Sequence, residues 1–107
     1  MELKQYSITL VNLDLTIGSE IKKTRACVVI SPNEINKFLN TVVIAPMTTN
    51  TKNYPTRIEV IHNNQKGMIA IDQIRTIDKS RIVRTFGLLS KSEIQKCKNI
   101  IKETLVD

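Results

Sequence analysis

Short runs of β-forming residues, each ended by a polar turn, constrain the fold of this chain more than any other feature. Cys27-Val28-Val29-Ile30 and Val42-Val43-Ile44-Ala45 are continuous apolar runs, which is typical of strands buried on both faces. Polar segments rich in Asn, Gly, Thr and Lys separate these runs and predict turns. The strands are expected over residues 6–13, 25–30, 41–47, 57–61, 68–74 and 79–89.

Two helices are predicted from capping patterns. Ser31 can cap a short helix that ends near residue 40, with Pro32 in its first position and Glu34 closing a capping box. Ser90 and Glu93 form a second capping box, which opens a C-terminal helix. The buried stripe of that helix is predicted to be Ile94, Cys97, Ile101 and Leu105. The chain is therefore expected to be a single domain over 1–107, mainly β (α+β), with a small, strongly bent sheet or open barrel.

Composition limits the core and the compartment. Aromatic residues make up 4% of the chain and Trp is absent, so the core must be aliphatic. The cysteines, Cys27 and Cys97, have no metal-like spacing and are expected to be buried thiols in a reducing compartment. The N-terminus has no apolar signal region, and the apolar runs are too short to span a membrane. We therefore expect a cytoplasmic protein with no membrane partner.

The charge balance is basic. The chain carries 16 Lys and Arg against 10 Asp and Glu, a net charge of +6. A basic surface favours polyanions such as RNA, DNA or an acidic protein segment. Solubility alone also explains such a charge, and the lysines at 91, 96, 98 and 102 are most simply the solvent-facing side of the C-terminal helix.

Several catalytic classes are disfavoured by the residues present. The single histidine, His62, excludes a two-histidine ribonuclease site, and the sequence shows no Ser-His-Asp set. The sequence contains no HExxH, CxxC, Walker or GxGxxG motif, and its acids are scattered singly. We therefore expect no metal and no cofactor. Phosphodiester chemistry, which needs only a base and a cation, remains open.

Polar residues at the ends of two apolar strands could carry that chemistry. Glu20 could take a proton, and Arg25 could make bidentate contacts to phosphate oxygens. Thr48 and Thr49 could donate hydrogen bonds to the same group. The alternative is structural: Glu20 and Arg25 form a loop salt bridge, the threonines end a strand, and Asp72 belongs to a solvated strand edge.

Ordered sequence pieces over about ninety residues resemble the MazF/PemK toxin family. They are Val11 to Asp14, Gly18 to Glu20, Arg25 to Pro32, Asn36, Val43 to Thr49, Tyr54-Pro55, Asp72 to Lys79, Arg81 and Gly87. The resemblance implies an SH3-like barrel of the CcdB/PemK type with a short internal helix and a C-terminal helix, and a homodimer. It also implies a metal-independent endoribonuclease that cuts single-stranded RNA at short sequences, leaving a 2',3'-cyclic phosphate and a 5'-hydroxyl. The implied partner is a cognate acidic antitoxin, which blocks the site and forms a DNA-binding complex with the toxin.

The resemblance also assigns site residues. It places the catalytic groups at Arg25, Thr48 and Glu20. Since a guanidinium rarely gives up its proton, Arg25 is assigned to electrostatic stabilisation and Glu20 to the base. The predicted substrate-binding residues are Ser19, Lys22, Lys23, Thr49, Asn50, Asp72, Gln73 and Arg75.

The sequence departs from the family pattern at several positions. Ser19 and Ala70 stand where the PemK branch has a histidine and an arginine, so the PemK version of the site is not carried over. Ala26 replaces the usual proline after the arginine. Two alternatives remain: a catalytically inactive binding module of the same fold, and a gyrase-binding module like CcdB, which needs a C-terminal tryptophan that this chain lacks. The predicted dimer interface comprises the C-terminal helix and the strand over 42–47.

Overall fold

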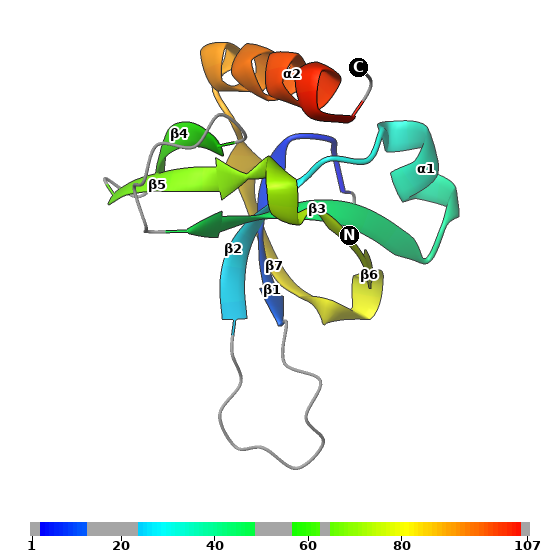
Figure 1. Ribbon diagram of the computed structural model, residues 1–107. Coiled ribbons are helices and arrows are strands. Elements are labelled where there is room, and N and C mark those ends of the chain that lie inside the picture. Colours follow the sequence, from blue (N-terminus) through cyan, green and yellow to red (C-terminus); the bar gives the residue numbers. More distant parts are fainter. Residues whose placement is uncertain (1–2, 13–23, 49–56, 63–64, 106–107) are drawn as a thin grey trace.

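Antiparallel strands form one strongly bent sheet, and a long helix lies across one of its faces (Figure 1). The computed structural model describes residues 3–12, 24–48, 57–62 and 65–105. The strands are β1 (Ser7–Asn12), β2 (Thr24–Val29), β3 (Thr41–Thr48), β4 (Arg57–His62), β5 (Gln65–Ala70), β6 (Arg75–Asp78) and β7 (Ile82–Leu88). The helices are α1 (Asn33–Phe38) and α2 (Lys91–Leu105), and the 3-10 turns are η1 (Ile71–Gln73) and η2 (Lys79–Arg81).

Strand β3 is the centre of the sheet. The strand order is β4-β5-β3-β2-β1-β7, and β6 also pairs with β3. Along β3, Val42 lies opposite Ile77 of β6, and Met47 lies opposite Ile69 of β5. The predicted mainly β fold with two helices is confirmed. In the described part of the chain no pairing joins β4 to β7, so the sheet does not close into a barrel.

The central position of β3 also corrects the predicted dimer interface. Val42, Ile44 and Ala45 are all buried within this chain, at 1% exposure or less. Their side chains are already used by the sheet's own cores. These three side chains therefore offer no surface to a second subunit, and the rest of the predicted interface stays a prediction.

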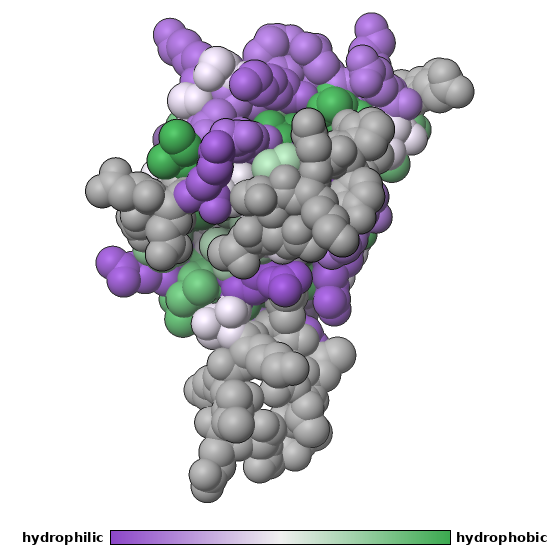
Figure 2. Space-filling model, turned by 60° about the vertical axis from the view of Figure 1, so that its left-hand side comes forward, coloured by the Kyte–Doolittle hydropathy of each residue, from purple (hydrophilic) through white to green (hydrophobic). Residues whose placement is uncertain are grey.

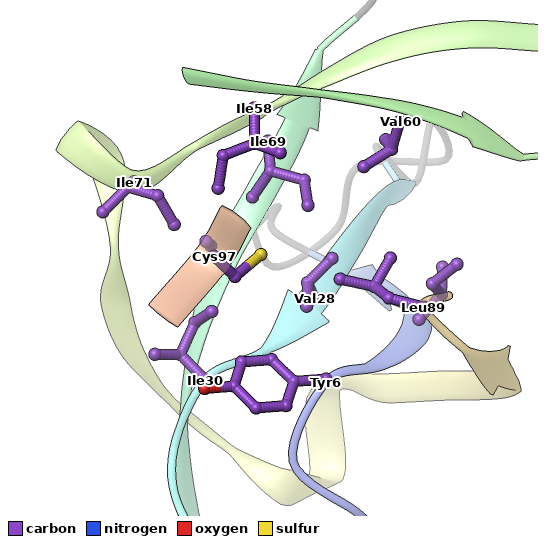
Figure 3. Close-up of a cluster of buried hydrophobic side chains, with 11 residues drawn as sticks. Tyr6, Val28, Ile30, Ile58, Val60, Ile69, Ile71, Leu89 and Cys97 are labelled. Atoms are coloured by element: carbon purple, nitrogen blue, oxygen red, sulfur yellow. The ribbon is translucent and has the colours of Figure 1, made fainter. Parts of the chain in front are cut away.

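Alternation along the strands divides the core into two clusters, one on each face of the sheet. We call the face under α2 the helix face and the other the open face. The cluster on the helix face contains Tyr6, Ile8, Val28, Ile30, Ala45, Ile58, Val60, Ile69, Ile71, Leu89 and Cys97 (Figure 3). The cluster on the open face contains Leu3, Val11, Cys27, Val29, Val42, Ile44, Ile77 and Ile82. Both are aliphatic apart from Tyr6 and the two cysteines, as the composition predicts.

Helix α2 begins at the predicted capping box. The Ser90 amide donates to Glu93 Oε1 at 2.9 Å, and the Glu93 amide donates to Ser90 Oγ at 3.2 Å. Glu93 Oε2 also accepts from the Ile61 amide at 3.2 Å, which ties the helix to β4. Cys97 is fully buried at the centre of the cluster (Figure 3). Leu105 is 51% exposed, so its predicted place in the stripe is wrong, because the last turn of α2 extends past the cluster.

The first capping box is wrong. The residue that precedes α1 is Pro32, and no side chain caps the helix. Ser31 is buried, and its hydroxyl instead bonds the Asn36 side chain and accepts from the Val43 amide at 3.1 Å. Asn36 returns a bond from Nδ2 to the Ser31 carbonyl at 2.8 Å, and its own carbonyl accepts from Lys79 Nζ. These groups join α1 to β3 and η2 rather than starting the helix.

Strand boundaries differ most after residue 62. Strand β5 begins at Gln65, inside the predicted turn, and ends at Ala70 rather than at residue 74. The turn η1 and strand β6 follow, and β6 was not predicted. The predicted strand over 79–89 opens with the 3-10 turn η2 before β7 begins at Ile82. Neither α-helix of the described residues has the length and apolar character needed to cross a bilayer.

Candidate functional site

Some of the predicted site residues lie in the part of the chain that the structure describes. These are Arg25, Thr48, Asp72, Gln73 and Arg75. The remaining ones lie outside the described residues, so their predicted roles stay predictions: Ser19, Glu20, Lys22, Lys23, Thr49 and Asn50.

Two of the predicted arginines lie on the open face. Arg25 of β2 is exposed and lies opposite Val11 of β1, a member of the open-face cluster. Arg75 of β6 is exposed and lies opposite Ile44 of β3, a member of the same cluster. Residues directly opposite each other in an antiparallel pair point to the same side of the sheet. The register therefore brings both guanidinium groups to one face.

Both arginines affect the pKa of the Cys27 thiol. Burial raises the pKa of this thiol to about 12, and the positive charges of Arg25 and Arg75 act in the opposite direction. Two arginines from different strands are thus near enough to influence one side chain. Because the thiol is neutral at physiological pH, Cys27 is a poor nucleophile and belongs to the apolar floor beneath the arginines.

Thr48 ends β3 on the same face. It is half-buried and lies opposite Met68 of β5. The antiparallel β2–β3 register pairs Cys27 with Pro46. Two residues before Cys27 and two residues after Pro46, the same register brings Arg25 and Thr48 level with each other. The approach of β5 depends on Gly67, since a Cβ there would lie 3.2 Å from the Thr48 carbonyl oxygen. The structure thus places the predicted catalytic arginine and threonine on neighbouring strands and on one face.

Asp72 and Gln73 lie in η1, between β5 and β6, and both are exposed. Asp72 Oδ1 lies 3.4 Å from Nε of Arg57, the first residue of β4. Arg57 in turn lies opposite Ala70 of β5, the position at which the sequence departs from the arginine of the PemK branch. Sequence reasoning missed Arg57 because its partnership depends on the β4–β5 register. The only sequence signal for Arg57 was its place in a segment, 57–61, that alternates charged and apolar residues.

The open face therefore carries cations from three strands. Arg25 comes from β2, Arg57 from β4 and Arg75 from β6, and the Thr48 side chain is on the same side of the sheet. Guanidinium groups bind phosphate oxygens through paired, charge-assisted hydrogen bonds. Such a face can bind the backbone of a nucleic acid and stabilise extra negative charge on one phosphate. In the described segments no three His, Cys, Asp or Glu side chains gather as metal ligands would.

Comparisons with known proteins agree with this fold. A family profile for the PemK-like, MazF-like toxin of type II toxin–antitoxin systems matches residues 4–105. An Endoribonuclease MazF from Staphylococcus saprophyticus is 29% identical over 109 residues, which cover 96% of this chain and 91% of that protein. The crystal structure of MazE–MazF (Form III) from Deinococcus radiodurans matches with a TM-score of 0.83 at 18% identity, covering 99% of this chain and 98% of its own. A mycobacterial endoribonuclease in complex with its cognate antitoxin matches with a TM-score of 0.82 at 17% identity, covering 96% and 94%.

Proposed function

Because this chain belongs to the PemK-like, MazF-like toxin family of type II toxin–antitoxin systems, we propose that it is an endoribonuclease and the toxin of such a pair. The observation that carries the proposal is the strand register, which brings Arg25 of β2 and Arg75 of β6 to the open face. Curated relatives with the name Endoribonuclease MazF support the same reaction. The proposed substrate is single-stranded RNA, cut at short sequences.

The proposed reaction uses the 2'-hydroxyl of the RNA as its nucleophile. A base takes the proton of this hydroxyl, and Glu20 is the proposed base. The 2'-oxygen then forms a bond to phosphorus, the bond from phosphorus to the 5'-oxygen breaks, and that oxygen takes up a proton from water and leaves as a 5'-hydroxyl. Arg25 stabilises the negative charge on the pentacoordinate phosphate, and Thr48 donates a hydrogen bond to it. The products are a 2',3'-cyclic phosphate and a 5'-hydroxyl, and no step requires a metal.

An RNA-cleavage assay in EDTA tests this reaction. The protein is incubated with mixed-sequence single-stranded RNA, and the ends of the products are identified by mass spectrometry. We expect cleavage to persist in EDTA and to leave cyclic phosphates, while DNA of the same sequence stays intact because it lacks the 2'-hydroxyl. Intact RNA would contradict the nuclease proposal. Activity only with added divalent ions would contradict the metal-independent mechanism.

The proposed protein partner is an acidic antitoxin. The arginines of the open face can bind the carboxylates of an acidic segment in addition to phosphates, so the two ligands should compete. Inhibition should weaken steeply with rising salt, because exposed charges are screened. Titration with the product of a neighbouring gene for an acidic protein measures this, and cleavage that persists at saturation would contradict it.

We also propose that the protein forms a homodimer. Ile35, Phe38 and Leu39, at and just after α1, are 41%, 78% and 50% exposed and offer apolar surface for self-association. The outer side of α2 suits such contacts less well, because hydrophilic side chains gather over it (Figure 2). Light scattering should give the mass of two chains, and a monomer mass at micromolar concentration would contradict the dimer.

A further inference from the structure

The side chain of Arg57 is unusually buried for a charged group on this surface. It is 10% exposed, and its Nε lies 3.4 Å from Asp72 Oδ1, which is 37% exposed. A second ion pair on the same hairpin, Lys66 with Glu59 at 3.2 Å, is 61% and 54% exposed. Exposed pairs contribute little, whereas a charge withdrawn from water needs its partner. The two pairs are therefore expected to differ in their effect on the fold, although each has one residue in β4.

The neighbourhood of Arg57 lets its side chain reach η1. Arg57 lies directly opposite Ala70, and Asp72 follows two residues later along the chain. Cβ atoms of directly opposite residues lie about 5 Å apart. Because the side chain of Ala70 is a single methyl group, it leaves room for the longer arginine to pass towards Asp72.

The turn η1 has no cap of its own. No side chain caps it at Ala70, whereas Asp78 caps the comparable turn η2 by accepting from the Ser80 amide at 2.8 Å. Ile71 fixes the turn from the helix face, where it is fully buried. The contact from Arg57 to Asp72 fixes the turn from its other, exposed side.

We propose that Arg57 is a positioning residue for the RNA-binding surface. By holding Asp72, it fixes η1 and the start of β6, and so keeps Gln73 and Arg75 in place. This inference rests on the proposed function, since it assigns the surface to RNA. Arg57 acts through Asp72 and need not touch the phosphate that reacts.

The test compares Arg57→Met and Arg57→Lys with the matched control Lys66→Met. For each variant, kcat and KM are measured on mixed-sequence single-stranded RNA below the onset of thermal unfolding. We expect Arg57→Met to raise KM roughly five- to tenfold with little change in kcat. Arg57→Lys should recover part of this loss, since it keeps the charge but not the fork. Lys66→Met should leave both constants unchanged.

The carboxylate side completes a double-mutant cycle. Asp72→Asn should raise KM by a similar factor, and Asp72→Asn combined with Arg57→Met should add little more, because both changes break the same contact. Additive losses, or an unchanged KM in folded Arg57→Met protein, would overturn the proposal.

Amide hydrogen exchange separates this proposal from the proposed function. Exchange in residues 71–75 should accelerate in Arg57→Met and stay unchanged in Lys66→Met. If the wild-type protein cuts no RNA, the proposed function fails, and exchange alone then decides whether Arg57 holds η1. Unchanged exchange in Arg57→Met would overturn the positioning role whether or not RNA is cut.

Discussion

The two faces of the sheet are built by the same strands but serve different ends. On the helix face, α2 closes an apolar cluster around Cys97 (Figure 3). On the open face, apolar residues form the floor, and arginines of β2, β4 and β6 rise from the strands around it. Strand alternation makes this division possible, because neighbouring residues point to opposite sides. Both faces thus contribute a buried apolar cluster to the fold, and the open face also carries the arginines.

The two buried thiols show that the faces also differ in electrostatic environment. Burial raises the pKa of Cys27 and of Cys97 to about 12 in both cases. At Cys27 the charges of Arg25 and Arg75 oppose this rise, whereas at Cys97 the carboxylate of Glu93 adds to it. The arginines thus place positive charge near the floor of the open face, which suits an anionic ligand, whereas a carboxylate lies near the thiol of the helix face.

The largest effect is expected from a cavity on the helix face. Ile69 is fully buried, so Ile69→Ala should lower the free energy of unfolding by about 2–5 kcal/mol. Urea unfolding measures this, with Leu105→Ala as the control, because Leu105 is 51% exposed and should change stability by less than about 0.5 kcal/mol. The folded fraction should keep its kcat. A large loss of kcat in the folded fraction would show that the faces are not independent.

The reverse pattern is expected on the open face. Arg25→Ala should lower the cleavage rate by about 100-fold or more with a smaller change in RNA binding, because the charge matters most in the transition state. Arg25→Lys should recover only part of the rate, and Thr48→Ala should lose less than Arg25→Ala, since its hydroxyl is neutral. Arg84→Ala, at an exposed arginine of β7, serves as the control. A wild-type rate in folded Arg25→Ala protein would remove Arg25 from the mechanism.

Alkaline pH should weaken the fold through the thiols of both faces. The ordinary pKa of 9.0 applies to the unfolded chain, whereas Cys27 and Cys97 in the folded protein lose their protons only near pH 12. Above pH 9 the unfolded state therefore gains ionised thiolates that the folded state lacks, and stability falls as pH rises to 12. Relative to neutral pH, the loss from the two thiols together should be on the order of 3 kcal/mol at pH 10. Unfolding of Cys27→Ala should depend less steeply on pH than that of the wild type, and equal slopes would count against this account.

A smaller effect is expected from the cap of α2. Ser90→Ala removes the acceptor for the Glu93 amide and should lower the free energy of unfolding by about 1 kcal/mol. The loss should appear in stability and not in kcat, since the cap serves the helix face. Thr104→Ala, at an exposed position of α2, is the control and should stay within about 0.5 kcal/mol of wild type. An equal loss in both variants would deny Ser90 a capping role.

Local sequence patterns predicted most strands and both helices. The features that they failed to predict depend on pairing between segments far apart in the sequence. The apolar runs of β2 and β3 and the capping box at Ser90 depend on nearby residues, so they could be predicted from the sequence. Strand β6 has four residues and forms because β3 offers its edge, which no local pattern records. Ser31 stands where the sequence pattern predicts a helix cap, but its hydroxyl forms hydrogen bonds with the Asn36 side chain and the Val43 amide instead.

The candidate site divides in the same way. Arg25 and Thr48 were predicted because the family resemblance marks them, and the register then places both on the open face. Arg57 carried no such mark. Its place depends on the pairing of β4 with β5 and on the small side chain of Ala70, which become visible only in three dimensions.

The pairing of β1 with β7 has a consequence for synthesis of the chain. Ser7 of β1 lies opposite Leu88 of β7. The second edge of β1 is therefore covered only when β7, the last strand of the described residues, has been made. During translation, β1 and β2 can pair early, but one edge of β1 stays open until β7 has been made. Contacts between such distant segments slow folding, and an open edge invites pairing with other chains. The growing polypeptide is therefore most vulnerable to aggregation just before its final helix is complete.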